Sequence, residues 1–391
     1  MDLPALKNTV NASSPQPGDL SAHSAILTVD LDALVANYAH IRALAPGVEV
    51  SGVVKANAYG HGLAPVGRAL ASAGCKTFFV ADTVEGATLR AALPDAAIYI
   101  TNGLSLNTGP AARAHALRPC LGSLAEIEAW RHEAKHAGHA LAAALHFDTG
   151  LSRLGLDAAE TAHLIAEPRL LEGIDVTLVM SHLACSDEPA HPLNARQLGR
   201  FKTIRAAFPS VPASFANTAG VLLGPDYHFD LLRPGYGLYG GTPVEGKPNP
   251  FRPVIKAEAR VLQIREVTAG DAAGYSATWT ATGPRRLATL SAGYADGYFR
   301  ALASAAGGGR VFIGGQYAPV VGRVSMDLLI VDISDHPEHM VRRGDLAELI
   351  GPHVSLDEVA ARAGTIGYEV LTSLGERYKR LYTGAAGPTE S

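Results

Sequence analysis

The sequence contains few cysteines and few charged residues. Of its 391 residues, 3 are cysteine and 18% are charged. Cys75, Cys120 and Cys185 are widely separated and form no C-x-x-C pair, which excludes a zinc or redox site of that type and is typical of reduced core thiols in a cytosolic protein. The charged fraction lies below the roughly 25% of an average soluble protein, which favours an oligomer whose subunit contacts remove surface from water.

Neither sign of charge dominates, and no apolar run is long enough to cross a membrane. Lys and Arg number 33 against 37 Asp and Glu, and the formal net charge of -4 argues against a nucleic-acid-binding surface. The apolar stretch at 140–145 ends at His146, far short of the roughly 20 residues of a membrane span. Residues 1–24 contain no apolar signal-peptide core, so we expect a disordered N-terminal tail on a cytoplasmic protein.

Between residues 50 and 240, short apolar runs alternate with segments of helical spacing. This alternation is typical of β/α units around a parallel sheet. The eight apolar runs are 52–54, 77–81, 98–101, 118–121, 141–147, 175–181, 213–216 and 231–239. The helical segments between them are 63–73, 84–93, 124–137, 158–166 and 194–208. Eight such units predict a (β/α)8 TIM-like barrel, which we place at residues 32–250.

The pattern changes at the proline-rich stretch 242–253, which we take as the boundary between two domains. Beyond it, β-branched alternation between glycine turns predicts a β-rich C-terminal domain at residues 251–391. Its expected strands are 254–267, 286–290, 310–313, 318–333 and 346–350, and its expected helices are 356–363 and 368–374. A short strand at 25–31 is expected to join this second domain.

Polar residues follow several predicted barrel strands, at the end where barrel enzymes have their active sites. These residues are Lys55, Arg153, His182, Asn217, Thr218 and Arg233. A lysine at the tip of an apolar strand can form a Schiff base, because burial lowers its pKa and frees the nucleophilic amine. Thr218 and the glycine of Arg233-Pro234-Gly235 offer a hydroxyl and a backbone N–H to a phosphate.

Other interpretations of the same residues remain open or are disfavoured. Taken alone, Lys55 also fits a solvated strand end, and each arginine or histidine also fits an ion pair or a structural hydrogen bond. Asp148-Thr149-Gly150 matches the aspartic-protease triplet, but that chemistry needs a second copy and the chain has none. The 15 histidines include no metal-binding His-x-His after the first strand, so we expect no metal.

The segment 53–62, Val-Val-Lys-Ala-Asn-Ala-Tyr-Gly-His-Gly, resembles the cofactor-lysine segment of the alanine racemases, which use pyridoxal 5'-phosphate. Further blocks resemble this family in the same order, at 148–155, 181–183, 233–235, 273–279, 293–297 and 322–327. The similarity covers residues 25–382. The blocks around Tyr275 and Met326 are specific to the racemases, whereas the Lys55 block is shared in part with other pyridoxal-phosphate barrels.

The resemblance implies two proton carriers on opposite faces of the substrate. Lys55, which also binds the cofactor, serves one face and Tyr275 serves the other. In this family the tyrosine reaches the site from the second subunit of a head-to-tail homodimer with shared active sites. His182, bonded to Arg233, is implied to support Tyr275, and Arg233 is implied to face the pyridine nitrogen.

Further positions correspond to binding residues of the family. The implied cofactor-binding residues are Lys55, Tyr59, Asn217, Thr218, Arg233, Gly235, Tyr236 and Tyr368. The implied substrate contacts are Arg153, the backbone of Met326, and Tyr294, which narrows the entrance. The chain departs from the family at His146, where many members carry a lysine that is often carbamylated and paired with the arginine. Histidine excludes that carbamate, so a bound anion or another carboxylate must orient Arg153.

Through this resemblance the sequence predicts a homodimeric isomerase that interconverts L- and D-alanine and supplies D-alanine for peptidoglycan. A broad-specificity or serine-preferring racemase is the near alternative, because a methylene-sized change in a pocket alters discrimination by only about 1–3 kcal/mol. A non-catalytic pyridoxal-phosphate carrier would lack the second domain, and a barrel decarboxylase has no use for a residue like Tyr275. The sequence does not separate a biosynthetic from a catabolic role.

Overall fold

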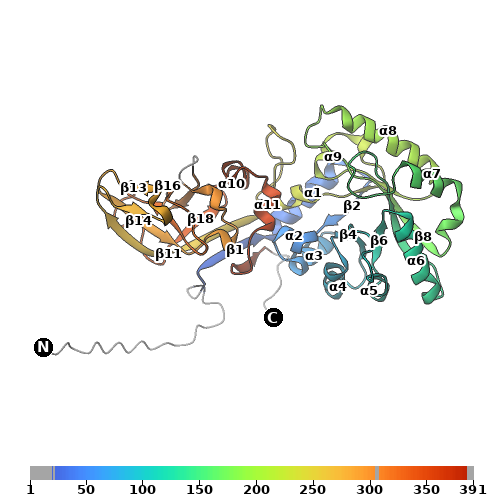
Figure 1. Cartoon of the computed structure of the whole chain (residues 1–391), viewed down its shortest axis with the longest axis horizontal. Coiled ribbons are helices and arrows are strands. Elements are labelled where there is room, and N and C mark those ends of the chain that lie inside the picture. Colours follow the sequence, from blue (N-terminus) through green and yellow to red (C-terminus); the bar gives the residue numbers. More distant parts are fainter. Residues whose placement is uncertain (1–19, 21–22, 304–307, 385–391) are drawn as a thin grey trace.

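The computed structural model describes residues 20, 23–303 and 308–384, which form two parts joined end to end (Figure 1). One part is a ring of parallel strands surrounded by helices, and the other is built around a mainly antiparallel sheet. The expected N-terminal tail, residues 1–24, lies almost entirely outside the described residues.

Eight parallel strands form the ring of the first part. Seven make one sheet, in the order β3 (Gly52–Val53), β4 (Thr77–Val80), β5 (Ala97–Ile100), β6 (Arg118–Leu121), β7 (Leu141–His146), β8 (Ile174–Met180) and β9 (Ala213–Ser214). The eighth, β10 (Leu231–Leu232), pairs with β2 (Glu49–Val50). Backbone hydrogen bonds from Arg233 to Ala216 and from Val53 to Pro234 join the β10 end to its neighbours on both sides. The ring is closed, and the predicted barrel is confirmed.

Helices cover the outside of the ring (Figure 1). They are α1 (Leu31–Leu44), α3 (Leu63–Ser72), α4 (Thr83–Ala92), α5 (Gly109–Ala114), α6 (Leu124–Ala137), α7 (Ala158–Ala166), α8 (Pro192–Ala207) and α9 (Thr218–Leu222). The side chains of Asp82, Ser123 and Asp157 accept hydrogen bonds from backbone N–H groups in the first turns of α4, α6 and α7. These N-caps fix where each helix begins, and so they fix the loops that follow the strands.

The second part contains an eight-stranded sheet in the order β14-β17-β16-β15-β18-β11-β1-β19. The strands are β1 (Ala25–Asp30), β11 (Ile255–Val267), β14 (Arg285–Leu290), β15 (Arg310–Ile313), β16 (Gln316–Val321), β17 (Leu329–Asp332), β18 (Leu346–Ile350) and β19 (Lys379–Thr383). β1 lies between β11 and β19 and leads directly into α1 of the barrel. Helices α10 (Leu356–Ala363) and α11 (Gly367–Thr372) lie towards the barrel (Figure 1). The predicted β-rich second domain is confirmed.

Two expected strands differ from the structure. The run 231–239 is a strand only at β10, because Pro234 follows and cannot donate a ladder hydrogen bond, and Tyr236–Tyr239 then forms a 3-10 helix. The run 318–333 is two strands, because Gly322 adopts a left-handed φ of 68° and begins the connection between β16 and β17. β19, a short and partly exposed edge strand, was not expected.

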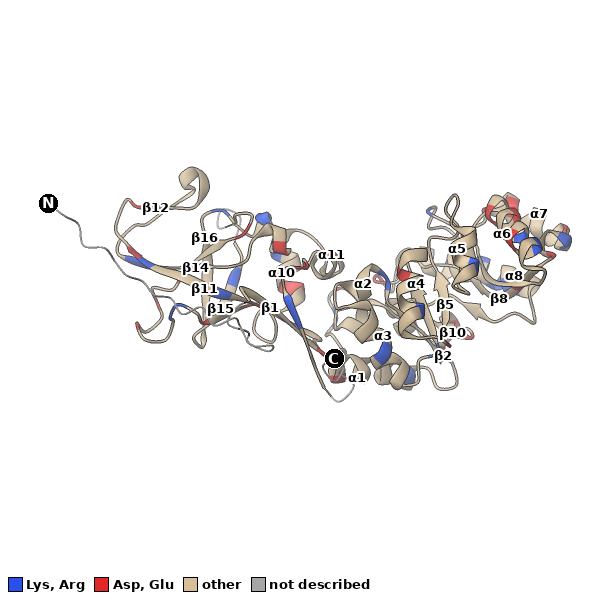
Figure 2. Cartoon of the chain, turned by 90° about the horizontal axis from the view of Figure 1, so that it is seen from below, with Lys and Arg blue, Asp and Glu red and all other residues tan. Residues whose placement is uncertain are grey.

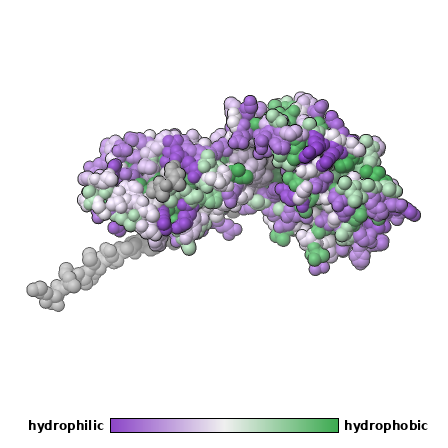
Figure 3. Space-filling model, turned by 45° about the horizontal axis from the view of Figure 1, so that its top comes forward, coloured by the Kyte–Doolittle hydropathy of each residue, from purple (hydrophilic) through white to green (hydrophobic). Residues whose placement is uncertain are grey.

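The two parts differ in apolar surface but not in the mixing of charges. Basic and acidic residues are interspersed along both parts (Figure 2). On the face drawn in Figure 3, apolar residues are more frequent over the barrel than over the second part. No helix in the described part of the chain is long and apolar enough to cross a membrane.

Candidate active site

A left-handed turn carries Lys55 at the end of β3. Residues 56–59 belong to the short helix α2 (Lys55–Tyr59), and their φ angles are 54°, 51°, 53° and 53°. Such a conformation costs on the order of 1 kcal/mol for each residue that has a Cβ. The sequence predicts Lys55 at the tip of a strand but does not predict this left-handed turn.

A cavity of about 780 Å³ opens at the carboxyl ends of the barrel strands. Helix α11 of the second part completes its wall, so the cavity lies where the two parts meet. The predicted site residues that line it are Lys55, Tyr59, Arg153, His182, Asn217, Thr218, Arg233, Gly235, Tyr236 and Tyr368. The structure therefore brings these residues of one chain together around one space.

The charged residues that line this cavity in the described chain are Lys55, Arg153, Arg233 and one carboxylate, Glu369. Burial, followed by the charge of Arg153, lowers the pKa of Lys55 below its ordinary value, and Glu85 partly opposes this shift. A lowered pKa increases the fraction of neutral, nucleophilic amine at neutral pH. The excess of positive charge suits a ligand that carries a phosphate or a carboxylate.

Arg233 is almost fully buried, with 4% of its surface exposed. Its guanidinium donates hydrogen bonds to the hydroxyl of Ser214 and to the backbone carbonyls of Ser181 and Phe215. The resemblance to the family implies a direct hydrogen bond between Arg233 and His182. The structure does not show it: Arg233 instead donates to the backbone carbonyl of Ser181, the residue before His182. Burial lowers the pKa of Arg233 to about 10, so the guanidinium stays charged at neutral pH.

Both histidines of the cavity are neutral at physiological pH. Burial, together with Arg233 and Arg153, lowers the pKa of His182 well below its ordinary value. The same causes lower the pKa of His146, at the end of β7, to about 4. A neutral imidazole cannot form an ion pair with Arg153, and none of the ion pairs found among the described residues involves Arg153.

Hydroxyl and backbone N–H groups gather at the end of the cavity formed by α9 and the turn after β10. The N–H of Gly235 donates to the hydroxyl oxygen of Thr218 over 3.0 Å. A Cβ on Gly235 would lie 2.4 Å from the hydroxyl oxygen of Tyr59, so glycine is needed for this approach. Tyr236 stacks on Tyr368 of α11 with ring centroids 3.9 Å apart. This end of the cavity can bind an anion.

Asn217 lines the cavity and also fixes the beginning of α9. Its side-chain oxygen accepts hydrogen bonds from the N–H of Gly220 over 2.8 Å and from the hydroxyl of Ser186 over 2.9 Å. Asn217 therefore positions Thr218, the first residue of the helix, towards the cavity.

The other predicted site residues lie on the surface of the second part. Tyr275 is 70% exposed, Met326 54% and Tyr294 42%. Backbone hydrogen bonds hold the last two together, from Tyr294 to Ser325 and from Ala295 to Met326, each over 3.0 Å. These three side chains are not among the described residues that line the Lys55 cavity, so one chain does not bring the two groups together.

Sequence reasoning missed two residues that hold these segments in place. Glu85 of α4 accepts a hydrogen bond from the N–H of Asn57 over 2.9 Å and so contacts the turn that carries Lys55. Arg377 donates two hydrogen bonds of 2.7 Å to Asp296, beside the Tyr294 turn, and one of 2.6 Å to Asp327. Glu85 occupies the third helical position after the N-cap Asp82, where an acidic residue usually caps its own helix. The sequence therefore gives no sign of its contact with Asn57.

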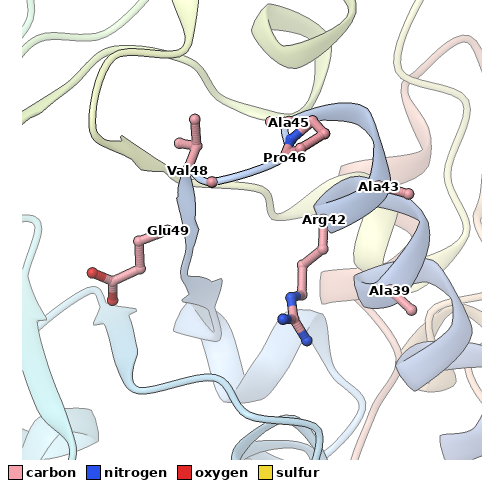
Figure 4. Close-up of a pocket in the computed structure, with 8 residues that line it drawn as sticks. Ala39, Arg42, Ala43, Ala45, Pro46, Val48 and Glu49 are labelled. Carbon is pink, nitrogen blue, oxygen red and sulfur yellow. The ribbon is translucent and has the colours of Figure 1, made fainter.

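A second cavity, of about 570 Å³, lies where α1 ends and β2 begins (Figure 4). Its charged lining residues are Arg42 and Glu49, and the others are small or apolar. Glu49 accepts a hydrogen bond from Thr77 over 2.6 Å. This cavity lies at the amino end of the barrel strands, the end associated with stability and not with catalysis.

No group of three or more His, Cys, Asp or Glu residues in the described ranges is placed to hold a metal ion. The Lys55 cavity itself is lined by a lysine, two arginines, two histidines and several hydroxyl groups. An amine with a lowered pKa, an anion-binding end and a buried arginine are all present in that space.

Known proteins resemble this chain over most of its length. The family models for the alanine racemase N-terminal and C-terminal domains match residues 29–243 and 254–382. The alanine racemase of Methylobacterium nodulans is 50% identical over 362 residues, which cover 93% of this chain and 97% of that protein. A protein of Mesorhizobium japonicum named as a catabolic alanine racemase is 48% identical over 371 residues, covering 94% and 96% of the two chains. The crystal structure of the alanine racemase from Bartonella henselae, with covalently bound pyridoxal phosphate, has a TM-score of 0.87 at 42% identity and covers 92% of this chain and 99% of its own. This chain belongs to the alanine racemase family.

Proposed function

We propose that this protein is an alanine racemase, an isomerase that interconverts L- and D-alanine with pyridoxal 5'-phosphate bound at Lys55. The observation that carries the proposal is the Lys55 cavity. It combines an amine of lowered pKa with a buried arginine and an anion-binding end in a chain of this family.

The residues of the cavity fit this cofactor. The phosphate is assigned to the hydroxyls of Tyr59 and Thr218, the backbone around Gly235 and Tyr236, and Tyr368, with Asn217 holding Thr218 in place. Arg233 is assigned to the pyridine nitrogen, because its buried charge has no carboxylate partner in the described residues. When bound, pyridoxal phosphate withdraws electrons from the substrate and makes the proton on Cα acidic.

Inversion then requires a proton carrier on each face of the substrate. Lys55 moves a proton at its Nζ atom on one face, and its lowered pKa keeps that nitrogen able to accept the proton. Tyr275 moves a proton at its phenol oxygen on the other face. Because Tyr275 is 70% exposed and belongs to the second part, we assign it to the cavity of a second copy in a homodimer.

Arg153 and Met326 are assigned to the substrate carboxylate. The guanidinium of Arg153 lines the cavity, and its planar N–H groups match the two oxygens of a carboxylate. The backbone of Met326 and the ring of Tyr294 are assigned to the same cavity from the second copy. His182 is neutral and lies beside Arg233 through Ser181, so we assign it to the support of Tyr275 without a direct bond to Arg233.

The same activity could serve two physiological roles. We propose supply of D-alanine for peptidoglycan as the main role, and the catabolic name of the Mesorhizobium japonicum relative makes breakdown of alanine the second candidate. A preference for serine is the alternative specificity. We place the protein in the cytoplasm, which is supported by the free and buried thiols of Cys75 and Cys120.

Incubation with pyridoxal phosphate and L-alanine in D2O tests the proposal. We expect D-alanine with deuterium at Cα, measured by chiral chromatography and mass spectrometry. Exchange at Cα with retained chirality would leave Lys55 active and refute the assignment of Tyr275. No exchange with alanine, but exchange with serine, would establish the alternative specificity, and no exchange with either would refute racemase activity.

A further inference from the structure

Asn57 is the centre of the hydrogen bonds that hold the left-handed turn after Lys55. Its side-chain oxygen accepts from the N–H of Leu63 over 2.7 Å, and its carbonyl accepts from the N–H of Gly62 over 2.9 Å. Both contacts connect the turn to the helix that follows it. The backbone N–H of Asn57 makes a different contact: it donates to the carboxylate of Glu85, which belongs to the next β/α unit.

Glu85 binds two parts of the barrel with its two oxygens. Oε1 accepts from the N–H of Asn57 over 2.9 Å, and Oε2 accepts from the N–H of Ala81 over 2.8 Å. Ala81 follows β4, the neighbour of β3 in the sheet. The bond to Ala81 belongs to the start of α4, but the bond to Asn57 spans 28 residues and has no role in capping that helix. An ionised carboxylate can accept from both N–H groups, whereas a carboxamide has one oxygen and must present N–H donors to one of them.

We infer that Glu85 is a positioning residue for Lys55: its carboxylate fastens the left-handed turn to the end of β4, so that the lysine amine and Tyr59 are held towards the cofactor cavity. This inference rests on the proposed function and deepens it. Glu85 does not line the cavity, so it acts through the turn and not by contact with substrate or cofactor.

The charge of Glu85 also acts on the amine. The groups that face Lys55 are Arg153 beyond β7, His182 beyond β8 and Glu85 on α4. Arg153 lowers the pKa of Lys55, Glu85 raises it, and His182 is neutral because burial lowers its own pKa. Removal of the Glu85 charge should therefore lower the pKa of Lys55 further, whereas a shorter carboxylate should preserve much of the charge effect and lose the hydrogen-bond geometry.

Two substitutions separate these contributions. The full-length apoenzymes of wild type, Glu85→Gln and Glu85→Asp are titrated with pyridoxal phosphate. The visible absorbance that follows covalent attachment to Lys55 gives the affinity and the rate of attachment at each pH. Glu128→Gln on α6 is the matched control, because it removes one exposed carboxylate that is paired with Arg131 and does not line the cavity.

We expect both Glu85 variants to bind the cofactor about tenfold more weakly, the loss that accompanies one charge-assisted hydrogen bond. In Glu85→Gln the pH midpoint of the attachment rate should also move to lower pH. In Glu85→Asp the midpoint should stay near that of wild type, and Glu128→Gln should match wild type in both quantities.

The inference would be overturned if Glu85→Gln kept the wild-type cofactor affinity and the wild-type pH midpoint of attachment. It would also be overturned if this midpoint shifted equally in Glu85→Gln, Glu85→Asp and the control Glu128→Gln. If circular dichroism showed Glu85→Gln to be unfolded, the affinity of Glu85→Asp would decide: a tenfold loss supports the positioning role, and no loss overturns it. A wild-type protein that attached no cofactor at Lys55 would instead refute the proposed function, and with it this inference.

Discussion

Pairing two inactive variants in one dimer is expected to restore racemase activity. Lys55 lines a cavity in its own chain, whereas Tyr275 is 70% exposed on the second part and does not line that cavity. If each active site combines Lys55 of one copy with Tyr275 of the other, a Lys55→Ala chain can still supply a tyrosine and a Tyr275→Phe chain can still supply a lysine. A mixed dimer then contains one complete site and one site that lacks both residues.

The expected magnitude follows from this symmetry. Each homodimer should lose roughly 10²–10⁴-fold in activity, because one proton carrier is missing from every site. The mixed dimer should show about half the wild-type activity, since one of the two equivalent sites is intact. Co-expression with two different affinity tags isolates the mixed dimer, and chiral chromatography of alanine measures its rate in both directions.

A dimer with the opposite arrangement is the matched control. A chain that carries both substitutions is paired with a wild-type chain, so the two dimers contain the same substitutions in total. With shared sites this control dimer has no complete site and should be inactive. Half activity in the control and none in the first mixed dimer would show that each site is built within one chain, and would refute the reasoning.

Three further predictions concern buried groups of the barrel. Between pH 7 and pH 5, the free energy of unfolding should fall by about 2 kcal/mol for each of His61 and His146. Burial lowers the pKa of each histidine from 6.5 to about 4, so the unfolded chain binds these protons at a higher pH than the folded chain does. Urea denaturation at both pH values measures the loss, and His146→Gln should reduce it. His146→Gln should leave kcat/KM unchanged in its dependence on pH between 6 and 9, since His146 is neutral throughout that range, and an altered profile would show that the imidazole titrates there. Gly235→Ala should destabilise the protein by about 1–3 kcal/mol and weaken cofactor binding, because the added Cβ would lie 2.4 Å from the hydroxyl oxygen of Tyr59. Thermal denaturation measures the first effect and a cofactor titration the second. Wild-type values in both would contradict the packing argument.

The barrel and most of its cavity could be predicted because their signals are local. Apolar runs of strand length recur between helical segments. Lys55 directly follows one such run, Thr218 comes two residues after another, and Arg233 lies within the last. Parallel strands bring those positions to the same end of a barrel, so sequence order alone groups them. The break between β16 and β17 and the early end of β10 depend on single turn residues, which are harder to recognise inside an apolar run.

The parts that could not be predicted depend on contacts distant in sequence. The segment Ala-Asn-Ala-Tyr at 56–59 contains no glycine, and Asn57 alone does not indicate four successive left-handed residues. Glu85 carries the usual signature of a helix start. The direct bond between His182 and Arg233 was expected from the family. In the structure the guanidinium binds the carbonyl of Ser181 instead, which depends on how deeply Arg233 is buried.

The position of β1 has a consequence for how the chain folds as it is synthesised. Ile26, Leu27 and Val29 of β1 are buried in the finished protein between β11 and β19, yet β1 leaves the ribosome long before either partner. At roughly 5–20 residues per second, this apolar strand waits on the order of a minute for the last strand of its sheet. During that interval the barrel can fold while β1 remains an unpaired edge that invites aggregation, so slow translation of the second part should increase the dependence of this protein on chaperones.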